Sequence, residues 1–183
     1  MKVKIREDIV ELGVNEFRKG LDYLEKGREQ REKYNSLVSQ KKLPGKMPSE
    51  IKQIERDIKF YGDLFAGNIA MSIDIMLKAM VYLFVPDTIP ETHHNQLENV
   101  DYLTSNYDIA PEIKDIDDVL NDIRYNASRT INNFIRDARY EGIRVLDERK
   151  VMMIINIAKS LEEFGLKNGL TNFDSYMQKF QYN

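Results

Sequence analysis

The sequence predicts an all-α protein, an antiparallel up-and-down bundle of five to six helices in a single domain. Apolar residues recur at three- and four-residue steps along most of the chain, the spacing that places them on one face of a helix. No alternating apolar–polar run is long enough for a sheet, and no internal repeat is apparent. With 183 residues, one compact domain with a sizeable core is the default expectation.

The first half of the chain predicts two long helices separated by a break. An apolar stripe from Ile5 to Leu24 indicates the first helix, and a basic, highly charged extension follows it as far as residue 48. Two prolines and a glycine between residues 44 and 48 end this helix. Ser49 is expected to cap the second helix, which runs to Phe84.

The second half predicts shorter helices around one more long one. Prolines between residues 85 and 90 mark a loop, a short helix follows to about residue 105, and Pro111 begins another. Asp147 is expected to cap the last long helix and Gly165 to end it. Residues 167–183 add a C-terminal helix or tail, and a short helix there is expected to dock on the bundle. Residues 49–166 are therefore the predicted core, flanked by 1–48 and 167–183.

Composition excludes several classes of site. The chain has no cysteine, which rules out disulfides, thiolate zinc sites and cysteine nucleophiles. The formal net charge of -3 argues against a protein that coats nucleic acid over its whole surface. The hydrophobic fraction of 42% is typical of a folded protein and not of a disordered one.

The longest apolar run, Ile69 to Val85, is close to membrane-spanning length. It contains two ionisable residues, Asp74 and Lys78, so a buried bundle helix is favoured over a membrane span. The N-terminal residues contain no apolar signal-peptide core. We therefore expect a cytoplasmic protein that does not enter the membrane.

Charge is unevenly distributed. Residues 98–122 are acidic, whereas residues 26–46 and 124–150 are basic. One interpretation is solvated helix faces of mixed charge. The other applies to the 124–150 zone, where arginines alternate with Tyr125, Phe134 and Tyr140 and could bind phosphate while the rings stack on bases.

Asp74 and Lys78 are the pair of residues that says most about a functional site. An acid and a base one helical turn apart in the most apolar helix must either pair with each other or face a polar cleft. The only histidines, His93 and His94, follow in the next loop. A metal held by them with Glu91 is disfavoured, because adjacent residues rarely point at one ion; we expect no metal and no cofactor.

Two stretches resemble HEPN domains (higher eukaryotes and prokaryotes nucleotide-binding). IAMSIDIMLKAMVYLFVPDTIPETHHNQLENV is similar to the family's core helix pair, with Asp74 and Lys78 as its acidic residue and lysine and Thr92 followed by a histidine as its Thr-His step. FIRDARYEGIRVLDERKVMMIINIAKSLEEFG is similar to the family's end, where an Ala-Arg-Tyr step (residues 138–140) precedes a helix centred on Ala158.

The resemblance implies a dimeric helical bundle with a polar cleft between its central helices. One set of HEPN proteins binds nucleotides or substrates beside a separate minimal nucleotidyltransferase, as in toxin–antitoxin pairs. Another set cuts RNA without metal, using an arginine followed four to six residues later by a histidine. In this chain no arginine precedes either histidine at that distance, and arginine itself cannot act as a base.

The favoured function is therefore non-catalytic binding of a nucleotide or RNA, in a homodimer that acts with a nucleotidyltransferase partner. The predicted binding residues are Asp74, Lys78, His94, Arg136, Arg139 and Tyr140. The alternative is a ribonuclease toxin with a non-standard site built from Arg124, Arg129 and Tyr140. A third interpretation is a structural bundle that binds another protein through its acidic face.

Overall fold

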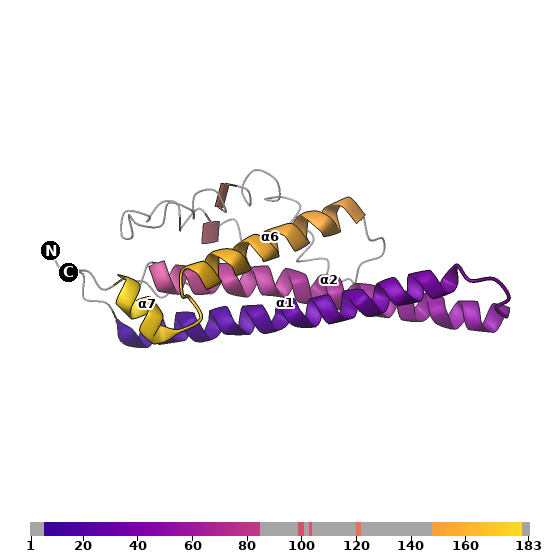
Figure 1. Cartoon of the computed structure of the whole chain (residues 1–183), viewed down its shortest axis with the longest axis horizontal. Coiled ribbons are helices and arrows are strands. Elements are labelled where there is room, and N and C mark those ends of the chain that lie inside the picture. Colours follow the sequence, from indigo (N-terminus) through magenta and orange to yellow (C-terminus); the bar gives the residue numbers. More distant parts are fainter. Residues whose placement is uncertain (1–5, 85–98, 101–102, 104–119, 122–147, 181–183) are drawn as a thin grey trace.

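A computed structural model of the chain describes residues 6–84, 99–100, 103, 120–121 and 148–180. Within these residues it contains four helices and no strand: α1 (Glu7–Lys41), α2 (Pro48–Phe84), α6 (Glu148–Lys167) and α7 (Phe173–Phe180) (Figure 1). The predicted all-α class is confirmed. The predicted total of five or six helices depends on residues 85–147, most of which lie outside this set, so it stays a prediction.

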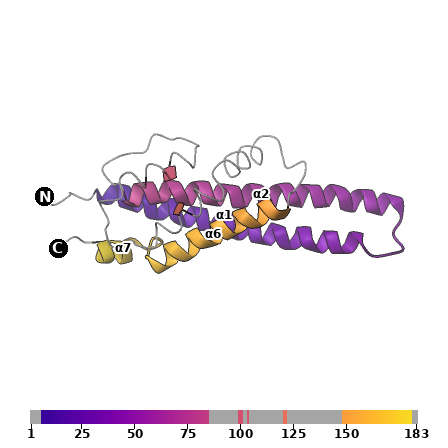
Figure 2. The same cartoon turned by 90° about the horizontal axis from the view of Figure 1, so that it is seen from above.

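Helices α1 and α2 lie side by side and run in opposite directions (Figures 1 and 2). Three glycines of α1 form the seam between them, and they recur every seven residues, a repeat that the pattern of apolar residues did not reveal. The seam pairs Gly13 with Leu83, Gly20 with Met76, and Gly27 with Ile69. Because the pairing order is reversed, the two helices are antiparallel, and α1 contributes buried residues to the core from Ile9 to Gly27.

The seam is close because its α1 positions lack side chains. A Cβ atom at Gly20 would lie 3.2 Å from the backbone nitrogen of Met76 and 3.3 Å from the carbonyl oxygen of Ser72. Such contacts with backbone atoms cannot be relieved by turning a side chain. Glycine therefore allows this close approach of the helices, although it costs an α-helix about 1 kcal/mol relative to alanine.

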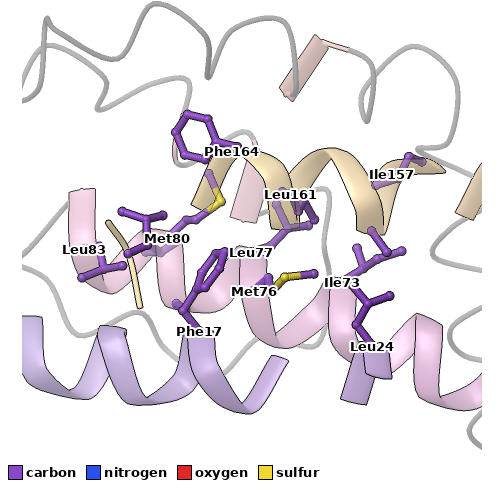
Figure 3. Close-up of a cluster of buried hydrophobic side chains, with 14 of the residues drawn as sticks. Phe17, Leu24, Ile73, Met76, Leu77, Met80, Leu83, Ile157, Leu161 and Phe164 are labelled. Carbon is purple, nitrogen blue, oxygen red and sulfur yellow. The ribbon is translucent and has the colours of Figure 1, made fainter. Parts of the chain in front are cut away.

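The second half of α2 is the centre of the core. Nearly every residue from Phe65 to Phe84 is buried or half-buried, as expected for the most apolar segment of the chain. Figure 3 shows side chains from three helices meeting there: Phe17 and Leu24 from α1, Ile73, Met76, Leu77 and Met80 from α2, and Ile157, Leu161 and Phe164 from α6.

The same helix has the length and apolarity needed to cross a membrane. It is the one described helix that meets this test, and 67% of its most apolar window is buried inside the protein. Burial of this kind is typical of a core helix, which agrees with the interpretation favoured from the sequence.

Helix α6 runs antiparallel to α1 and parallel to α2. Its C-terminal Phe164 lies against Phe84, with ring centroids 6.2 Å apart, while near its other end Met152 contacts Arg31 of α1. Gly165 lies at the point where α6 meets α1, and a Cβ atom there would fall 2.1 Å from the Phe17 ring. The role of this glycine is close packing.

The prediction that Gly165 ends the last long helix is wrong. Helix α6 continues to Lys167, and the glycine with positive φ is Gly169, at +70°. The Leu170 amide donates to the Gly165 carbonyl at 2.9 Å and the Gly169 amide to the Leu166 carbonyl at 3.2 Å, which is a Schellman motif. The pattern identified the wrong glycine because both positions follow an apolar helical run.

The prediction that Ser49 caps the second helix is also wrong. Helix α2 begins one residue earlier, at Pro48, whose fixed φ and missing amide hydrogen suit the first helical position. The Glu50 carboxylate accepts a hydrogen bond of 2.8 Å from the Met47 amide, so the side chain that closes this end comes from inside the helix.

The C-terminal helix α7 docks on the bundle, as predicted. Its Tyr176 hydroxyl donates a hydrogen bond to the Leu83 carbonyl in the last described turn of α2. The segment before α7 is held by Arg18 Nε, which donates to the Thr171 carbonyl oxygen at 2.6 Å. The start of α7 is capped by Asn172, whose side-chain oxygen accepts from the Ser175 amide at 2.9 Å.

The outer part of the α1–α2 pair extends beyond the start of α6 (Figures 1 and 2). We call residues 33–60 the arm. No residue of the arm is buried, and three of its large apolar side chains are exposed by more than half: Leu43, Met47 and Phe60. Seven lysines and arginines against three carboxylates give it a charge of +4, within a chain whose total is -3. The sequence predicted a basic extension here; the structure shows that it is helical to Lys41.

Candidate functional site

Asp74 and Lys78 are both half-buried on α2, one turn apart, between buried neighbours. The structure describes both side chains, and no ion pair within 4.0 Å joins them. Lys78 Nζ instead lies 5.7 Å from the centroid of the Tyr82 ring, the next position along the same face. Of the two arrangements that the sequence allowed, direct pairing is therefore not the one observed.

The two residues share a face of α2 that points away from α1. With about 100° of rotation per residue, Asp74 and Lys78 fall on the side of the helix opposite to Met76 and Ile69, which contact the glycine seam. Gly67 and Met71 continue the same half-buried stripe. The family resemblance also predicts that these two residues face a cleft.

Four of the six predicted binding residues lie outside the described residues: His94, Arg136, Arg139 and Tyr140. The same is true of Arg124 and Arg129, which the ribonuclease alternative requires. Their relation to Lys78 therefore stays a prediction. In the parts of the chain that the structure does describe, no group of three or more acidic or histidine side chains could hold a metal ion.

A second feature, which the sequence-based choice of site residues missed, is a pocket where α6 begins to pack on α1 and α2. Its volume is about 340 Å³, within the usual range for small-molecule sites. α1 supplies its polar and cationic side, and α2 and α6 supply apolar side chains. The lining residues are Arg31, Tyr34, Asn35, Val38, Lys42, Phe65, Val151 and Met152.

The α1 residues of the pocket follow helical spacing. Arg31, Tyr34 and Val38 of α1, and Lys42 directly after its end, recur at steps of three or four, so they form one stripe about 16 Å long. The signal lay within the basic zone from residue 26 to 46, which we had interpreted as a solvated face. Only the position of α6 shows that part of this face is covered.

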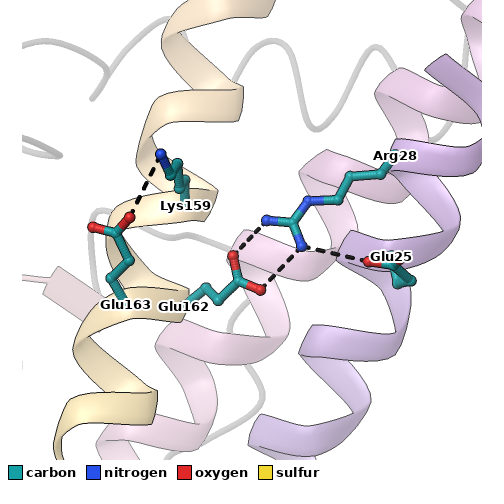
Figure 4. Close-up of polar contacts among 5 residues, drawn as sticks. All are labelled: Glu25, Arg28, Lys159, Glu162 and Glu163. Carbon is teal, nitrogen blue, oxygen red and sulfur yellow. Dashed lines mark hydrogen bonds and ion pairs between the residues drawn. The ribbon is translucent and has the colours of Figure 1, made fainter. Parts of the chain in front are cut away.

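Arg28, one turn before the pocket, forms ion pairs with two glutamates and does not line the pocket. Its guanidinium forms a two-point contact with the Glu162 carboxylate on α6, including a hydrogen bond of 3.0 Å from Nη1, and lies 3.4 Å from Glu25 (Figure 4). Hydrogen bonding to Glu162 raises the pKa of Arg28 above its ordinary value. The nearby Lys159–Glu163 pair of Figure 4, at 3.6 Å, is exposed and contributes little.

Comparisons with protein-family models, with curated proteins and with solved structures find no match to this chain. The resemblance to HEPN domains therefore rests on the residues of the two stretches, 69–100 and 134–165, and on the helical architecture.

Proposed function

We propose that this protein is a non-catalytic HEPN-type helical module that binds a nucleotide or an RNA end. The observation that carries the proposal is the environment of Lys78. This lysine is half-buried on the face of α2 that is turned away from α1. In the described part of the chain, no carboxylate lies within 4.0 Å of its ammonium group. A buried ammonium group normally needs a charged partner, and a phosphate would supply one.

The resemblance supports the rest of the proposal. It places Asp74 beside Lys78 at the cleft and adds Arg136, Arg139, Tyr140 and His94 as further contacts. It also implies a homodimer and a separate minimal nucleotidyltransferase as protein partner. The missing arginine–histidine motif favours binding over RNA cleavage.

Titration calorimetry with ATP, GTP, AMP and a short RNA tests the proposal. Lys78→Ala is expected to weaken binding by about 1–3 kcal/mol, the usual value of a charge-assisted hydrogen bond to phosphate. Lys26→Ala is the matched control, because Lys26 also lies over a tyrosine ring, at 5.3 Å, but on the exposed surface of α1. Equal effects of the two substitutions, or no heat at millimolar ligand, would contradict the proposal.

Incubation with total RNA in the presence of a chelator separates binding from cleavage. Intact RNA is the expected result. Cleavage that Arg129→Ala abolishes would replace the proposed function with the ribonuclease alternative.

A further inference from the structure

We propose that the pocket between α1, α2 and the start of α6 binds a small ligand made of a phosphate group attached to a flat ring. This site is separate from the Lys78 face of α2, and the proposal stands whether or not Lys78 binds a nucleotide. Its elements are the guanidinium of Arg31, the rings of Tyr34 and Phe65, and a second cation, Lys42, at the far end of the stripe.

The first argument concerns Arg31. A guanidinium group has five N–H donors and prefers carboxylate or phosphate oxygens. Arg31 is half-buried, and its one hydrogen bond in the described part of the chain goes from Nη2 to the sulfur of Met152, at 3.2 Å. The thioether sulfur of methionine is a weak hydrogen-bond acceptor. A hydrogen bond from Arg31 to an oxyanion would therefore be more favourable than the one to Met152.

The second argument is the contrast with neighbouring cations. Arg28 is bound to Glu162, and Lys41 lies 2.8 Å from Glu55. Arg31 and Lys42 line the pocket without an ion pair of this kind among the described residues. The positive charge of Arg31 and Lys42 at the pocket is therefore not offset by an ion pair with a described carboxylate, which favours an anionic ligand.

The third argument is the apolar wall. The ring centroids of Tyr34 and Phe65 lie 5.9 Å apart at 45°, and Phe65 is only 2% exposed, so it forms a fixed floor. Val38, Val151 and Met152 complete a surface on which a flat ring can pack. A volume of about 340 Å³ accommodates a molecule of mononucleotide size and not a helix.

The experiment uses the full-length protein with ¹³C-methyl-labelled methionine, because the Met152 methyl group belongs to a residue that lines the pocket. Its NMR signal is assigned by its loss in Met152→Leu. Phenyl phosphate and AMP are the probes, and the response to each separates an aryl phosphate from a nucleotide as the preferred source. Inorganic phosphate and adenosine, each lacking one half of the ligand, are the comparison compounds.

We expect at least one of the two probes to shift the Met152 signal at concentrations where phosphate and adenosine do not. Arg31→Ala should raise the dissociation constant by about tenfold or more, and Lys42→Ala by a smaller factor. Arg56→Ala, at an exposed arginine of α2 outside the pocket, is the matched control and should leave it unchanged. Val38→Phe should also abolish the shift, because the larger side chain would fill the cavity.

The proposal is overturned if neither probe moves the Met152 signal, if phosphate alone moves it equally, or if Arg31→Ala and Arg56→Ala have the same effect. AMP is used in both experiments, so the variants assign its binding: Arg31→Ala is expected to weaken binding in the pocket, and Lys78→Ala binding on the α2 face. The two proposals can therefore fail separately.

Discussion

Gly20 shows how one missing side chain sets the distance between two helices. A Cβ atom at this position would lie 2.5 Å from Met76 Cγ and within 3.3 Å of two backbone atoms of α2. The side chain of Met76 could turn away, but the backbone contacts would force α1 and α2 apart along a seam that buries the centre of the core.

Gly20→Ala is therefore expected to lower the free energy of unfolding by about 1–2 kcal/mol, because overpacking outweighs the gain in helix propensity. Urea denaturation measures the change. Asn15→Ala, at an exposed position of the same helix, is the control and should be neutral or stabilising. A Gly20→Ala protein as stable as the wild type would show that the seam is looser than described.

At the same scale, the sequence identified Asp74 and Lys78 as unusual residues but did not show what they contact. Their spacing allowed an ion pair, yet none joins them, and Lys78 Nζ lies 5.7 Å from the centroid of the Tyr82 ring. Arg31 and Lys42, in contrast, did not stand out in the sequence at all. They lie in an ordinary charged stretch, and only α6, more than a hundred residues later in the chain, turns part of that stretch into a pocket.

At the level of elements, a hydrogen bond between distant parts of the chain links α7 to α2. The buried Tyr176 hydroxyl donates to the Leu83 carbonyl, which lies in the last described turn of α2. Tyr176→Phe leaves that carbonyl without its donor and is expected to destabilise the protein by about 1–2 kcal/mol.

Thermal or urea unfolding measures this loss, and Tyr23→Phe is the comparison, since Tyr23 is a half-buried residue of α1. Limited proteolysis gives a second readout, because a weakened α7 should be cut earlier. Equal stability of Tyr176→Phe and the wild type would mean that the hydrogen bond contributes nothing net.

The ends of helices were predictable from the sequence where proline and glycine restrict the backbone. The proline–glycine break after residue 41 agrees with the structure, and α2 is helical up to Phe84, where this stretch of described residues stops. Ser49 and Gly165 were assigned wrongly, because several nearby residues could serve as caps and the choice depends on φ at one position. Gly169 adopts that φ, while Gly165 is held inside the helix by its contact with Phe17.

At the scale of the whole molecule, the arm is the described part of the chain with the least tertiary support. Residues 33–60 have no buried side chain, whereas fifteen of the twenty residues from 65 to 84 are buried and the other five are half-buried. Lys41–Glu55 is an exposed ion pair, which adds little to the stability of this part. Local opening should therefore require less free energy in the arm than in the core.

Hydrogen exchange followed by mass spectrometry tests this expectation. Amides of residues 33–60 should exchange faster than those of residues 65–84, and the difference should grow as denaturant is added below the global transition. Protection in the arm equal to that of the core would show that another surface covers it in solution.

The sequence by itself determined the all-α class, the two long helices of the first half, the apolar centre between residues 65 and 84, and the docking of a C-terminal helix. These follow from local periodicity and from proline and glycine, which act within a few residues. The glycine seam, the parallel course of α2 and α6, the separation of Asp74 from Lys78 and the Arg31 pocket were decided only by tertiary structure. Each depends on which surfaces meet across the chain, and packing between distant helices leaves no signal in the spacing of apolar residues alone.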